Sequence, residues 1–208
     1  MKASFVFAAA LAASLSQADL TSTFDVDNEG WMAADVSTTD LSIQSSAPTT
    51  WNAGHIEAME FGNAFFVLSA PSAYLGDLSG YYGGTTSFTL SDTVRDGLAY
   101  PNLLIRGNGF AMAYVTPPPA SLPGTSYTIP MTESGWIDFN QRPVSRTAFL
   151  NALSNVDEFG VSADWATLRR DSVTLDNVRV AAVPEPSTLA ALGLGLCAAL
   201  RRRRLRVS

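Results

Sequence analysis

Short apolar and β-branched runs, divided by clusters of Gly, Pro, Asn, Asp and Ser, fill the middle of the chain. Several runs alternate in polarity: Thr86, Phe88 and Leu90 would point to one side of an extended strand, and their neighbours to the other. Many short strands at this spacing are typical of an antiparallel sandwich with one polar face per sheet. The strands predicted are 21–24, 56–61, 65–69, 85–90, 102–106, 110–115, 127–129, 135–139, 159–163 and 172–180.

One segment has helical spacing instead. Ser145 is a suitable N-cap, and the apolar residues Phe149, Leu150 and Leu153 come after it at intervals typical of a helix. The pattern predicts a helix over residues 146–155. In a sandwich, such a helix usually covers an open end of the core.

The first residues differ in composition from the middle of the chain. Lys2 precedes an apolar run over 5–15, and Ser16 and Ala18 are the small residues expected before a cleavage point after Ala18. This pattern predicts a signal peptide over residues 1–18, with an apolar helix at this end of the chain, and therefore export. The alternative is a buried N-terminal helix, which the acidic, turn-forming residues after Ala18 disfavour.

The last residues form a tripartite pattern. Pro184, Glu185 and Pro186 cannot continue a strand or a helix, so they separate the domain from the C-terminal residues. An apolar helix predicted over 189–200 would span only about 18 Å, less than the roughly 30 Å of a hydrocarbon core. It therefore suits a transient anchor, with a cytoplasmic stop supplied by Arg201, Arg202, Arg203 and Arg204.

This ending resembles the PEP-CTERM sorting signal, which combines a Pro-Glu-Pro motif, an apolar helix and an arginine cluster. The resemblance implies that residues 183–208 are a sorting tail and that Pro184, Glu185 and Pro186 are its processing signal. It also implies a partner: exosortase, a membrane transpeptidase of Gram-negative bacteria that make exopolysaccharide. The apolar part is somewhat shorter here than is usual in that family.

Charge narrows the classes of partner. The whole chain carries a net charge of −6, but residues 19–186 hold seven arginines and nineteen acidic residues, which gives −12. A segment this acidic is a poor partner for nucleic acid or an anionic membrane surface. Divalent cations and neutral glycans are more plausible. The only cysteine, Cys197, lies in the predicted tail helix, so the domain has no disulfide.

Three consecutive runs carry a second resemblance. They are Phe-Val-Leu-Ser-Ala-Pro at 66–71, Tyr-Leu-Gly-Asp-Leu-Ser at 74–79 and Tyr-Tyr-Gly-Gly-Thr-Thr-Ser-Phe at 81–88. Together with Leu-Ile-Arg-Gly at 104–107 and Leu-Asp-Asn-Val at 175–178, they resemble the laminin B (laminin IV type A) domain over about residues 22–180. The resemblance implies that residues 19–182 form an all-β, antiparallel jelly-roll β-sandwich, related to galactose-binding domains, with an adhesive or matrix role and no known catalysis.

Two acidic spots are candidates for a structural calcium ion. Asp25 and Asp27 lie in the acidic opening of the domain, and Asp176 lies near its end. Carboxylate oxygens are ligands that calcium prefers. Because the first and last strands of a jelly roll commonly pair, the two spots could meet. The alternative is a solvated turn before Gly30, and no other cofactor is indicated.

Aromatic residues could stack on sugar rings. Of these residues, Trp51 and Tyr82 are predicted to be exposed and are the candidates for glycan binding, whereas Trp31, Tyr74 and Tyr81 occupy positions that the fold itself needs. Packing in the core is the favoured interpretation for the group as a whole.

No catalytic residue is nominated. A glycosidase needs two carboxylates at a defined separation, and nineteen acidic residues guarantee chance pairs such as Glu57 with Glu60 or Asp157 with Glu158. His55 is the only histidine, and no Gly-x-Ser-x-Gly motif is present.

The sequence therefore predicts an exported, non-catalytic protein. It would be sorted by exosortase through the inner membrane to the cell surface or the extracellular matrix, with a structural or adhesive role in exopolysaccharide. The alternative is a carbohydrate-binding module with a specific glycan ligand, and a glycan-active enzyme is a more distant one.

Overall fold

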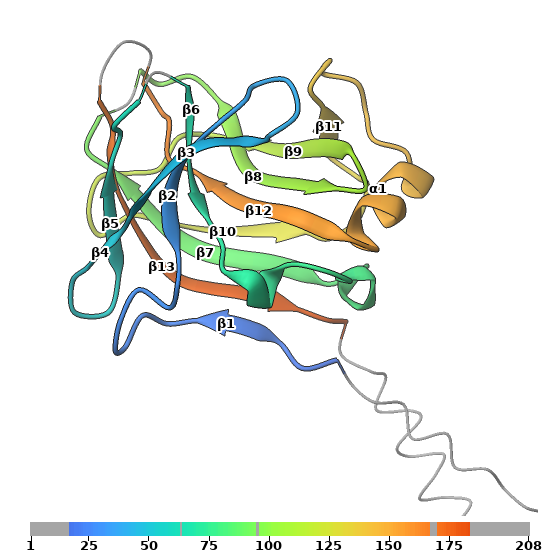
Figure 1. Ribbon diagram of the computed structural model, residues 1–208, viewed down its shortest axis with the longest axis horizontal. Helices are drawn as coiled ribbons and strands as arrows, with labels where there is room; N and C mark the ends of the chain where they lie inside the picture. The colour runs from blue at the N-terminus through green and yellow to red at the C-terminus, as the bar shows by residue number, and fades with distance from the viewer. Residues whose placement is uncertain (1–16, 63, 95, 167–169, 184–208) are drawn as a thin grey trace, which may run out of the picture. The chain divides into compact units, whose positions relative to one another are not determined.

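Two antiparallel sheets pack against each other in the computed structural model, as Figure 1 shows. The structure describes residues 17–62, 64–94, 96–166 and 170–183, and the unit that these residues build is compact from Ala18 to Val183. Within these ranges, one short α-helix and two 3-10 turns accompany the strands. The predicted all-β sandwich is confirmed, whereas the two predicted terminal helices lie outside the described residues.

The six-stranded sheet has the order β10–β7–β13–β5–β4, and β1 pairs with the second half of β13. The long strand β13 is therefore central: it pairs with β7 on one side and with β5 and β1 on the other. The strands are β1 Leu20–Ser22, β4 Thr50–Trp51, β5 Ile56–Met59, β7 Thr85–Asp92, β10 Thr125–Pro130 and β13 Ser172–Ala181.

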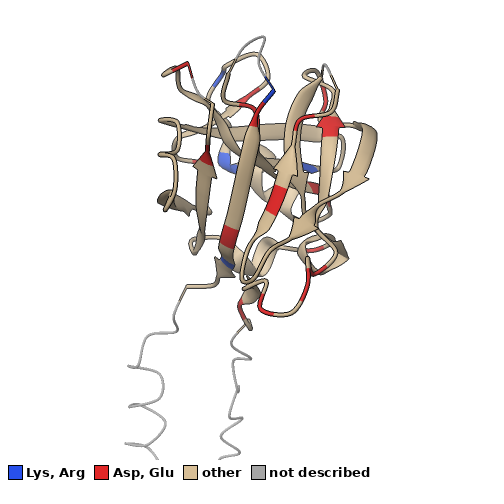
Figure 2. Cartoon of the chain, turned by 90° about the vertical axis from the view of Figure 1, so that its left-hand side faces the viewer, with Lys and Arg blue, Asp and Glu red and all other residues tan. Residues whose placement is uncertain are grey.

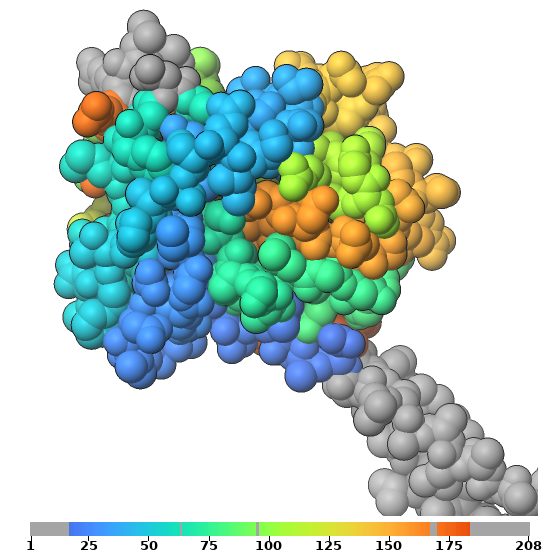
Figure 3. Space-filling model, in the orientation of Figure 1, coloured from blue at the N-terminus to red at the C-terminus, as the bar shows by residue number. Residues whose placement is uncertain are grey.

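The seven-stranded sheet has the order β11–β9–β8–β12–β6–β2–β3. It faces the viewer in Figures 1 and 3. Its strands are β2 Met32–Val36, β3 Ile43–Pro48, β6 Phe65–Ser69, β8 Tyr100–Gly107, β9 Phe110–Thr116, β11 Trp136–Asp138 and β12 Val156–Ser162.

The alternating residues of β7 that share one side of the strand are buried in the core between the two sheets. In β7, Thr86, Phe88 and Leu90 are buried, as predicted. Trp31 and Tyr74 are also buried, and both donate a hydrogen bond to the hydroxyl of Ser22 in β1, at 3.0 and 2.9 Å. The indole and the phenol are therefore structural rather than available to a ligand, which confirms the packing interpretation for these two residues.

The helix α1, Arg146–Leu153, begins where the sequence predicts and ends two residues earlier. The Ser145 hydroxyl accepts a hydrogen bond from the backbone N–H of Ala148, which is the N-cap that the sequence indicates. Phe149 is fully buried, and its ring meets that of Trp136 edge to face with 5.3 Å between centroids. The helix thus covers the core near β8 and β9. The two 3-10 turns are η1 Ser72–Tyr74 and η2 Ser79–Tyr81.

Three strands, β2, β3 and β4, have no counterpart in the predicted set. β2 reads Met-Ala-Ala-Asp-Val, and β3 reads Ile-Gln-Ser-Ser-Ala-Pro, so neither shows the β-branched and aromatic enrichment of a strand. β2 is nevertheless a strand because it pairs with β6 on one side and β3 on the other. Its extended form is decided by partners distant in the sequence.

The first and last strands lie side by side. Leu20 is opposite Val180 in the ladder of β1 and β13, and the Tyr81 hydroxyl donates a 2.6 Å hydrogen bond to the carbonyl of Ala18. Both ends of the compact unit therefore leave from one end of the sandwich. In Figure 1, β13 runs toward this end from the opposite one, at upper left. Its ten residues cover about 30 Å.

Candidate functional site

The outer face of the seven-stranded sheet carries a small apolar cluster of its own. Figure 3 shows this face with the β2–β3 hairpin raised on it. Leu41, in the loop of the hairpin, is only 1% exposed and has a positive φ of 58°, a conformation that bulky residues rarely adopt. Its burial against Val67 and Leu104 offsets that strain. The loop is therefore fixed against the sheet and shapes the face.

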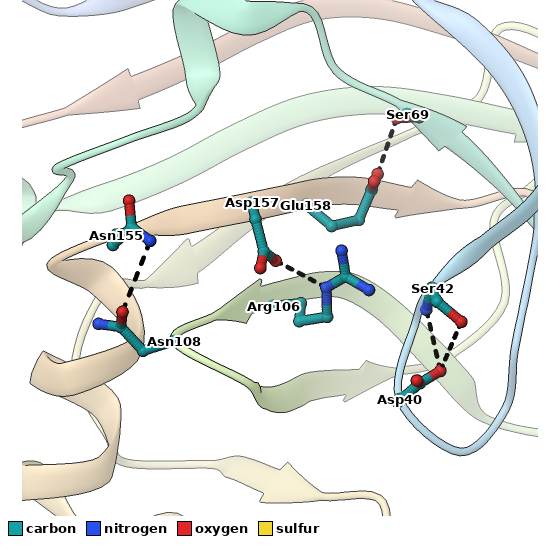
Figure 4. Close-up of polar contacts among 8 residues, drawn as sticks. All are labelled: Asp40, Ser42, Ser69, Arg106, Asn108, Asn155, Asp157 and Glu158. Atoms are coloured by element: carbon teal, nitrogen blue, oxygen red, sulfur yellow. Dashed lines mark hydrogen bonds and ion pairs between the residues drawn. The ribbon is translucent and has the colours of Figure 1, made fainter.

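A polar group next to this apolar cluster consists of Asp40, Ser69, Arg106, Asp157 and Glu158, here called the Arg106 cluster. The Nε of Arg106 donates to an Asp157 carboxylate oxygen at 2.6 Å, and the Ser69 hydroxyl donates to Glu158 at 2.7 Å. Figure 4 shows the guanidinium between Asp157 and the loop that carries Asp40. One arginine is thus surrounded by three carboxylates and a hydroxyl, all from β6, β8, β12 and the β2–β3 loop.

Burial and hydrogen bonds shift the pKa values of these carboxylates in opposite directions. Burial raises the pKa of Glu158, while the hydrogen bond from Ser69 and the charge of Arg106 partly oppose this. Hydrogen bonds from Ser42 hold the pKa of Asp40 below its ordinary value. The cluster therefore offers both charged acceptors and a cationic donor, which are the groups that hydrogen-bond sugar hydroxyls.

Two pockets flank the β2–β3 loop and share Thr38 and Phe65 as lining residues. The smaller, of about 370 Å³, is mainly apolar and lies over β9 and β11. The larger, of about 650 Å³, here called the acidic pocket, lies at the end of the sandwich where β5 and β12 end. Its lining includes Thr38, Gln44, Glu60, Phe65, Tyr100 and Asp164. Both volumes lie in the range of small-molecule sites.

Four carboxylates gather at the acidic pocket from four separate segments. Glu60 and Asp164 line it, and the charges of Asp35 and Asp171 act on Asp164. Burial, with the neighbouring acids adding to it, raises the pKa of Asp164 to about 6. Burial also raises the pKa of Asp171 to about 6, although the backbone N–H groups of Trp165 and Ala166 partly oppose it by donating to that carboxylate.

The two predicted glycan-binding aromatics occupy different environments. Trp51 in β4 is 42% exposed, and its indole N–H donates to the carbonyl of Phe24 at 2.6 Å. Tyr82 is half-buried: its hydroxyl donates to Glu133, the Arg146 guanidinium lies 5.2 Å from its ring centroid, and its ring contacts Phe149. Trp51 thus remains available for stacking, whereas the ring of Tyr82 is already contacted by the protein's own groups.

The three carboxylates predicted to bind calcium are only partly brought together. Burial raises the pKa of Asp176, and the charge of Asp25 adds to the shift, so these two acidic spots do approach each other. Asp27 instead accepts the backbone N–H of Glu29 within its own turn. Among the described residues, no group of three or more acidic, histidine or cysteine side chains is placed to hold a metal ion. Calcium binding by Asp25, Asp27 and Asp176 therefore stays a prediction.

Pro184, Glu185 and Pro186 and the arginines at 201–204 lie outside the described residues, as does most of the predicted signal peptide. Within the ranges that the structure describes, no helix is long and apolar enough to cross a membrane.

Sequence reasoning did not find the acidic pocket, and it treated Asp157 and Glu158 as a chance pair. Acids that come just after a strand, as Glu60 and Asp164 do, look like ordinary solvated loop residues. The one available signal was Asp35, a charged residue between the apolar positions of Ala34 and Val36. It could not be used because the segment was not predicted as a strand.

The fold and the site define the class: over the described residues, an antiparallel two-sheet sandwich domain with one short helix, an apolar pocket on its outer face and an acidic pocket at one end. Comparison with known proteins is more specific. The sequence matches the family described as Laminin B (Domain IV) over residues 67–192, and the PEP-CTERM protein-sorting motif over residues 182–204. The chain belongs to the laminin B (Domain IV) family and carries a PEP-CTERM sorting motif, as its sequence motifs indicated.

A solved structure has a similar fold, and a curated protein has a similar sequence over part of this chain. The L4b domain of human laminin alpha-2 is similar with a TM-score of 0.62 and 18% identity, over 79% of this chain and 98% of that one. The mouse (Mus musculus) basement membrane-specific heparan sulfate proteoglycan core protein is 30% identical over 112 residues, which are 52% of this chain. The match spans only 3% of that protein's length.

Weaker likenesses are to two structures of the family 11 carbohydrate-binding module of Clostridium thermocellum, one of them in complex with a mixed-linked tetrasaccharide. Their TM-scores are 0.45 and 0.43, with 16% and 17% identity. Each covers 85% of this chain, and 93% and 94% of the respective module.

Proposed function

We propose that this protein is exported, processed by exosortase and retained at the cell surface or in the exopolysaccharide matrix, where its sandwich domain has a structural or adhesive, non-catalytic role. The observation that carries the proposal is the presence of a laminin B domain and a PEP-CTERM motif in one chain. The motif begins at residue 182, directly after β13 ends at Ala181. A matrix role is also consistent with the name of the mouse relative, a basement-membrane protein.

The arrangement of the strands supports attachment through one end. Because β1 and β13 pair, the segment after the predicted signal peptide and the segment before the sorting motif leave the domain together. The acidic pocket lies about 30 Å away, at the other end of β13. A domain held by its C-terminal side would therefore present the pocket outward. Figure 2 shows acidic positions, in red, along the strands and loops of the domain. The net negative charge of the domain would favour neutral or cationic matrix components over anionic ones.

Replacing Glu185 tests the sorting part of the proposal. In the native host, Glu185→Gln is expected to abolish C-terminal processing, because the carboxylate is the only charged group of the Pro-Glu-Pro motif. Intact mass of the protein in each cell fraction measures this: the wild type should begin at Asp19 and lack the residues after the motif. Glu57→Gln, the same change on β5, is the matched control and should be processed normally. An unchanged mature mass in Glu185→Gln would rule out this role for the motif.

A second candidate function is recognition of a specific glycan. The observation that favours it is the Arg106 cluster, which presents a cationic donor and charged acceptors next to the β2–β3 loop, the loop that the two pockets flank. A structural component should show no saturable preference on a glycan array, whereas a binding module should.

If the domain is a binding module, Arg106→Gln is expected to lower its affinity for the preferred glycan at least tenfold, because the cationic donor at the centre of the cluster is lost. Arg179→Gln is the matched control, since Arg179 also pairs with an aspartate, Asp19, but near the chain ends. Equal binding by the two variants would exclude the Arg106 cluster as the site.

A further inference from the structure

The smaller of the two pockets, here called the apolar pocket, is a hollow in the outer face of the seven-stranded sheet. Ala113 of β9, which is only 3% exposed, lies at its floor, and the longer side chains of Phe65, Val115 and Phe139 line it. Phe65 and Phe139 also pack against the apolar cluster of this face. The hollow exists because a short side chain lies among long ones. Its volume of about 370 Å³ is at the lower end of the range for small-molecule sites.

The two loops that bound the apolar pocket are held in fixed conformations. The β2–β3 loop, which supplies Thr38, is fixed by the apolar cluster below it. On the other side, Asp138 closes the turn after β11, because its carboxylate accepts the backbone N–H groups of Asn140 and Arg142. The carbonyl of Asp138 also accepts the N–H of Gln141. A pocket with preformed walls can bind a ligand without the entropic cost of ordering a loop.

Two polar side chains stand at the rim of the apolar pocket. Gln141 has a φ of 60°, a left-handed conformation that residues other than glycine and asparagine rarely adopt, and its side chain lines the pocket. Thr38 lines it from the opposite loop, and both residues are exposed. Neither side chain has a hydrogen-bond partner among the described residues. The rim therefore offers one amide and one hydroxyl group to a ligand.

The charge at the apolar pocket is balanced by the domain's own groups. Among the described residues that line it, Asp138 is the only charged one, and Arg142 forms an ion pair with it at 2.7 Å. The hydrogen bonds from Arg142 hold the pKa of Asp138 below its ordinary value, so the pair stays ionised at neutral pH. The described lining therefore suits a neutral ligand.

A neutral sugar with an acetamido group matches these features. The methyl of an acetyl group can enter an apolar hollow at no polar cost, whereas a hydroxyl at the same place would lose its hydrogen bonds to water. The amide of Gln141 has both donors and an acceptor, so it can pair with the N–H and C=O groups of an acetamide. Phe139 provides aromatic surface for the apolar face of the sugar ring.

The Arg106 cluster lies close to the apolar pocket on the same face. Arg106 is opposite Ala111 in the ladder of β8 and β9. Ala113, at the pocket floor, is two residues further along β9, which is about 7 Å. A polysaccharide with one sugar residue in the pocket can therefore reach the cluster with a neighbouring residue.

We propose that the apolar pocket binds an N-acetylated hexosamine residue of a neutral polysaccharide. Gln141 and Thr38 hydrogen-bond the acetamido group, Phe65 and Val115 contact its methyl group, and Phe139 packs against the sugar ring. The inference rests on the glycan-binding function proposed above and names its ligand class.

Calorimetric titration of the protein purified from its native host tests the ligand class. The two main probes are the β-1,4-linked tetramers of N-acetylglucosamine and of glucose, which share ring and linkage and differ in the acetamido group. The acetylated tetramer is expected to bind at least tenfold tighter. Equal affinities, or no saturable binding of the acetylated tetramer, would overturn the proposal. The methylamide of N-acetylated leucine, which has an acetamide and an apolar chain without a sugar ring, is the third probe. If it bound as tightly, the sugar assignment would be wrong.

Two variants locate the site. Gln141→Gly keeps a residue that favours the left-handed conformation but removes the amide, and it is expected to lower the affinity for the acetylated tetramer at least tenfold. Asn140→Gly, in the same turn but not lining the pocket, is the matched control. Val115→Asp is expected to abolish binding by placing a charge in the hollow, whereas Val26→Asp, at a valine that is 80% exposed, should not. Circular dichroism verifies that each variant is folded. Unchanged binding by both pocket variants would exclude the site.

Failure of this inference is distinguishable from failure of the proposed function. A preferred glycan on the array that depends on Arg106 but not on an acetamido group or on Gln141 would retain glycan binding and overturn only the inference. If the array shows no saturable preference and the acetylated tetramer does not bind, both fail. Exosortase processing in the Glu185→Gln experiment is independent of either result.

Discussion

Gly84→Ala is expected to destabilise the domain by about 3 kcal/mol, at the upper end of the usual cost of overpacking. Gly84 directly precedes β7, and an added β-carbon would overlap the carbonyl oxygen of Ala181 and lie 3.1 Å from the Cα of Ala182. These are backbone atoms at the end of the central strand β13, which is held by β7 and β1. They cannot move aside as the tip of a flexible side chain would. Urea denaturation of the wild type and the variant measures the difference.

Gly160→Ala is the matched control. Gly160 lies in the interior of β12, and an added β-carbon would meet its nearest atoms, on Val67, at 3.5 and 3.6 Å, which is ordinary contact. This variant is expected to change the free energy of unfolding by less than about 1 kcal/mol. If the two variants were equally stable, the close approach between the start of β7 and the end of β13 would be incorrect.

Lowering the pH from about 7.5 to about 5 is expected to stabilise the domain by on the order of 2 kcal/mol. The cause is the acidic pocket, where burial and neighbouring acids raise the pKa of Asp164 and that of Asp171 to about 6. Because these values exceed those of the unfolded chain, near 3.9, the folded state binds protons first as the pH falls. The figure is well below the sum of the two shifts because Asp164 is partly exposed and the two groups interact.

Other acids act in the opposite direction at lower pH. Hydrogen bonds from Ser42, Asn52 and Arg142 lower the pKa values of Asp40, Glu57 and Asp138, respectively. The small stability that these solvent-accessible acids provide is present above the pKa of the unfolded chain and is lost as the pH falls below about 4. Maximum stability is therefore expected near pH 5.

Asp164→Asn tests the assignment of the pH effect to the pocket. The amide keeps an acceptor for the backbone N–H of Phe66, so the variant is expected to be more stable than the wild type at about pH 7.5 and equal to it near pH 4.5. Asp77→Asn is the control: hydrogen bonds from Ser79 lower the pKa of Asp77, so its loss should not stabilise the domain at any pH. Destabilisation by Asp164→Asn at neutral pH would mean that the charge of Asp164 is already satisfied.

Local patterns in the sequence were sufficient to predict most elements of the fold. Alternation in β7 and helical spacing after Ser145 predict elements that the structure confirms, because these segments contain their own signals: polarity at every second residue, or a capped apolar stripe. The family could be recognised for the same reason, since its motifs over 66–88 are continuous in the chain. The jelly-roll relation to galactose-binding domains remains a prediction.

The candidate site could be recognised only from the tertiary structure. Asp35, Glu60, Asp164 and Asp171 lie in segments spread over 136 positions of the sequence, from 35 to 171, and no spacing in the sequence relates them. Asp35 is brought to the pocket only because β2 pairs with β6, although its sequence has little preference for an extended strand. Asp27 shows the reverse case: its place in the acidic opening of the domain suggested a metal site shared with Asp176, but its carboxylate accepts the N–H of Glu29 within a local turn.

Local interactions therefore decide the features that the sequence alone determined: the strands with clear alternation, the capped helix, the family and the sorting motif. The tertiary structure decided which polar groups are buried together. Strand pairing and desolvation depend on residues far apart in the chain, so the ionisation of Asp164, the availability of Trp51 and the enclosure of Tyr82 are set only once both sheets have formed.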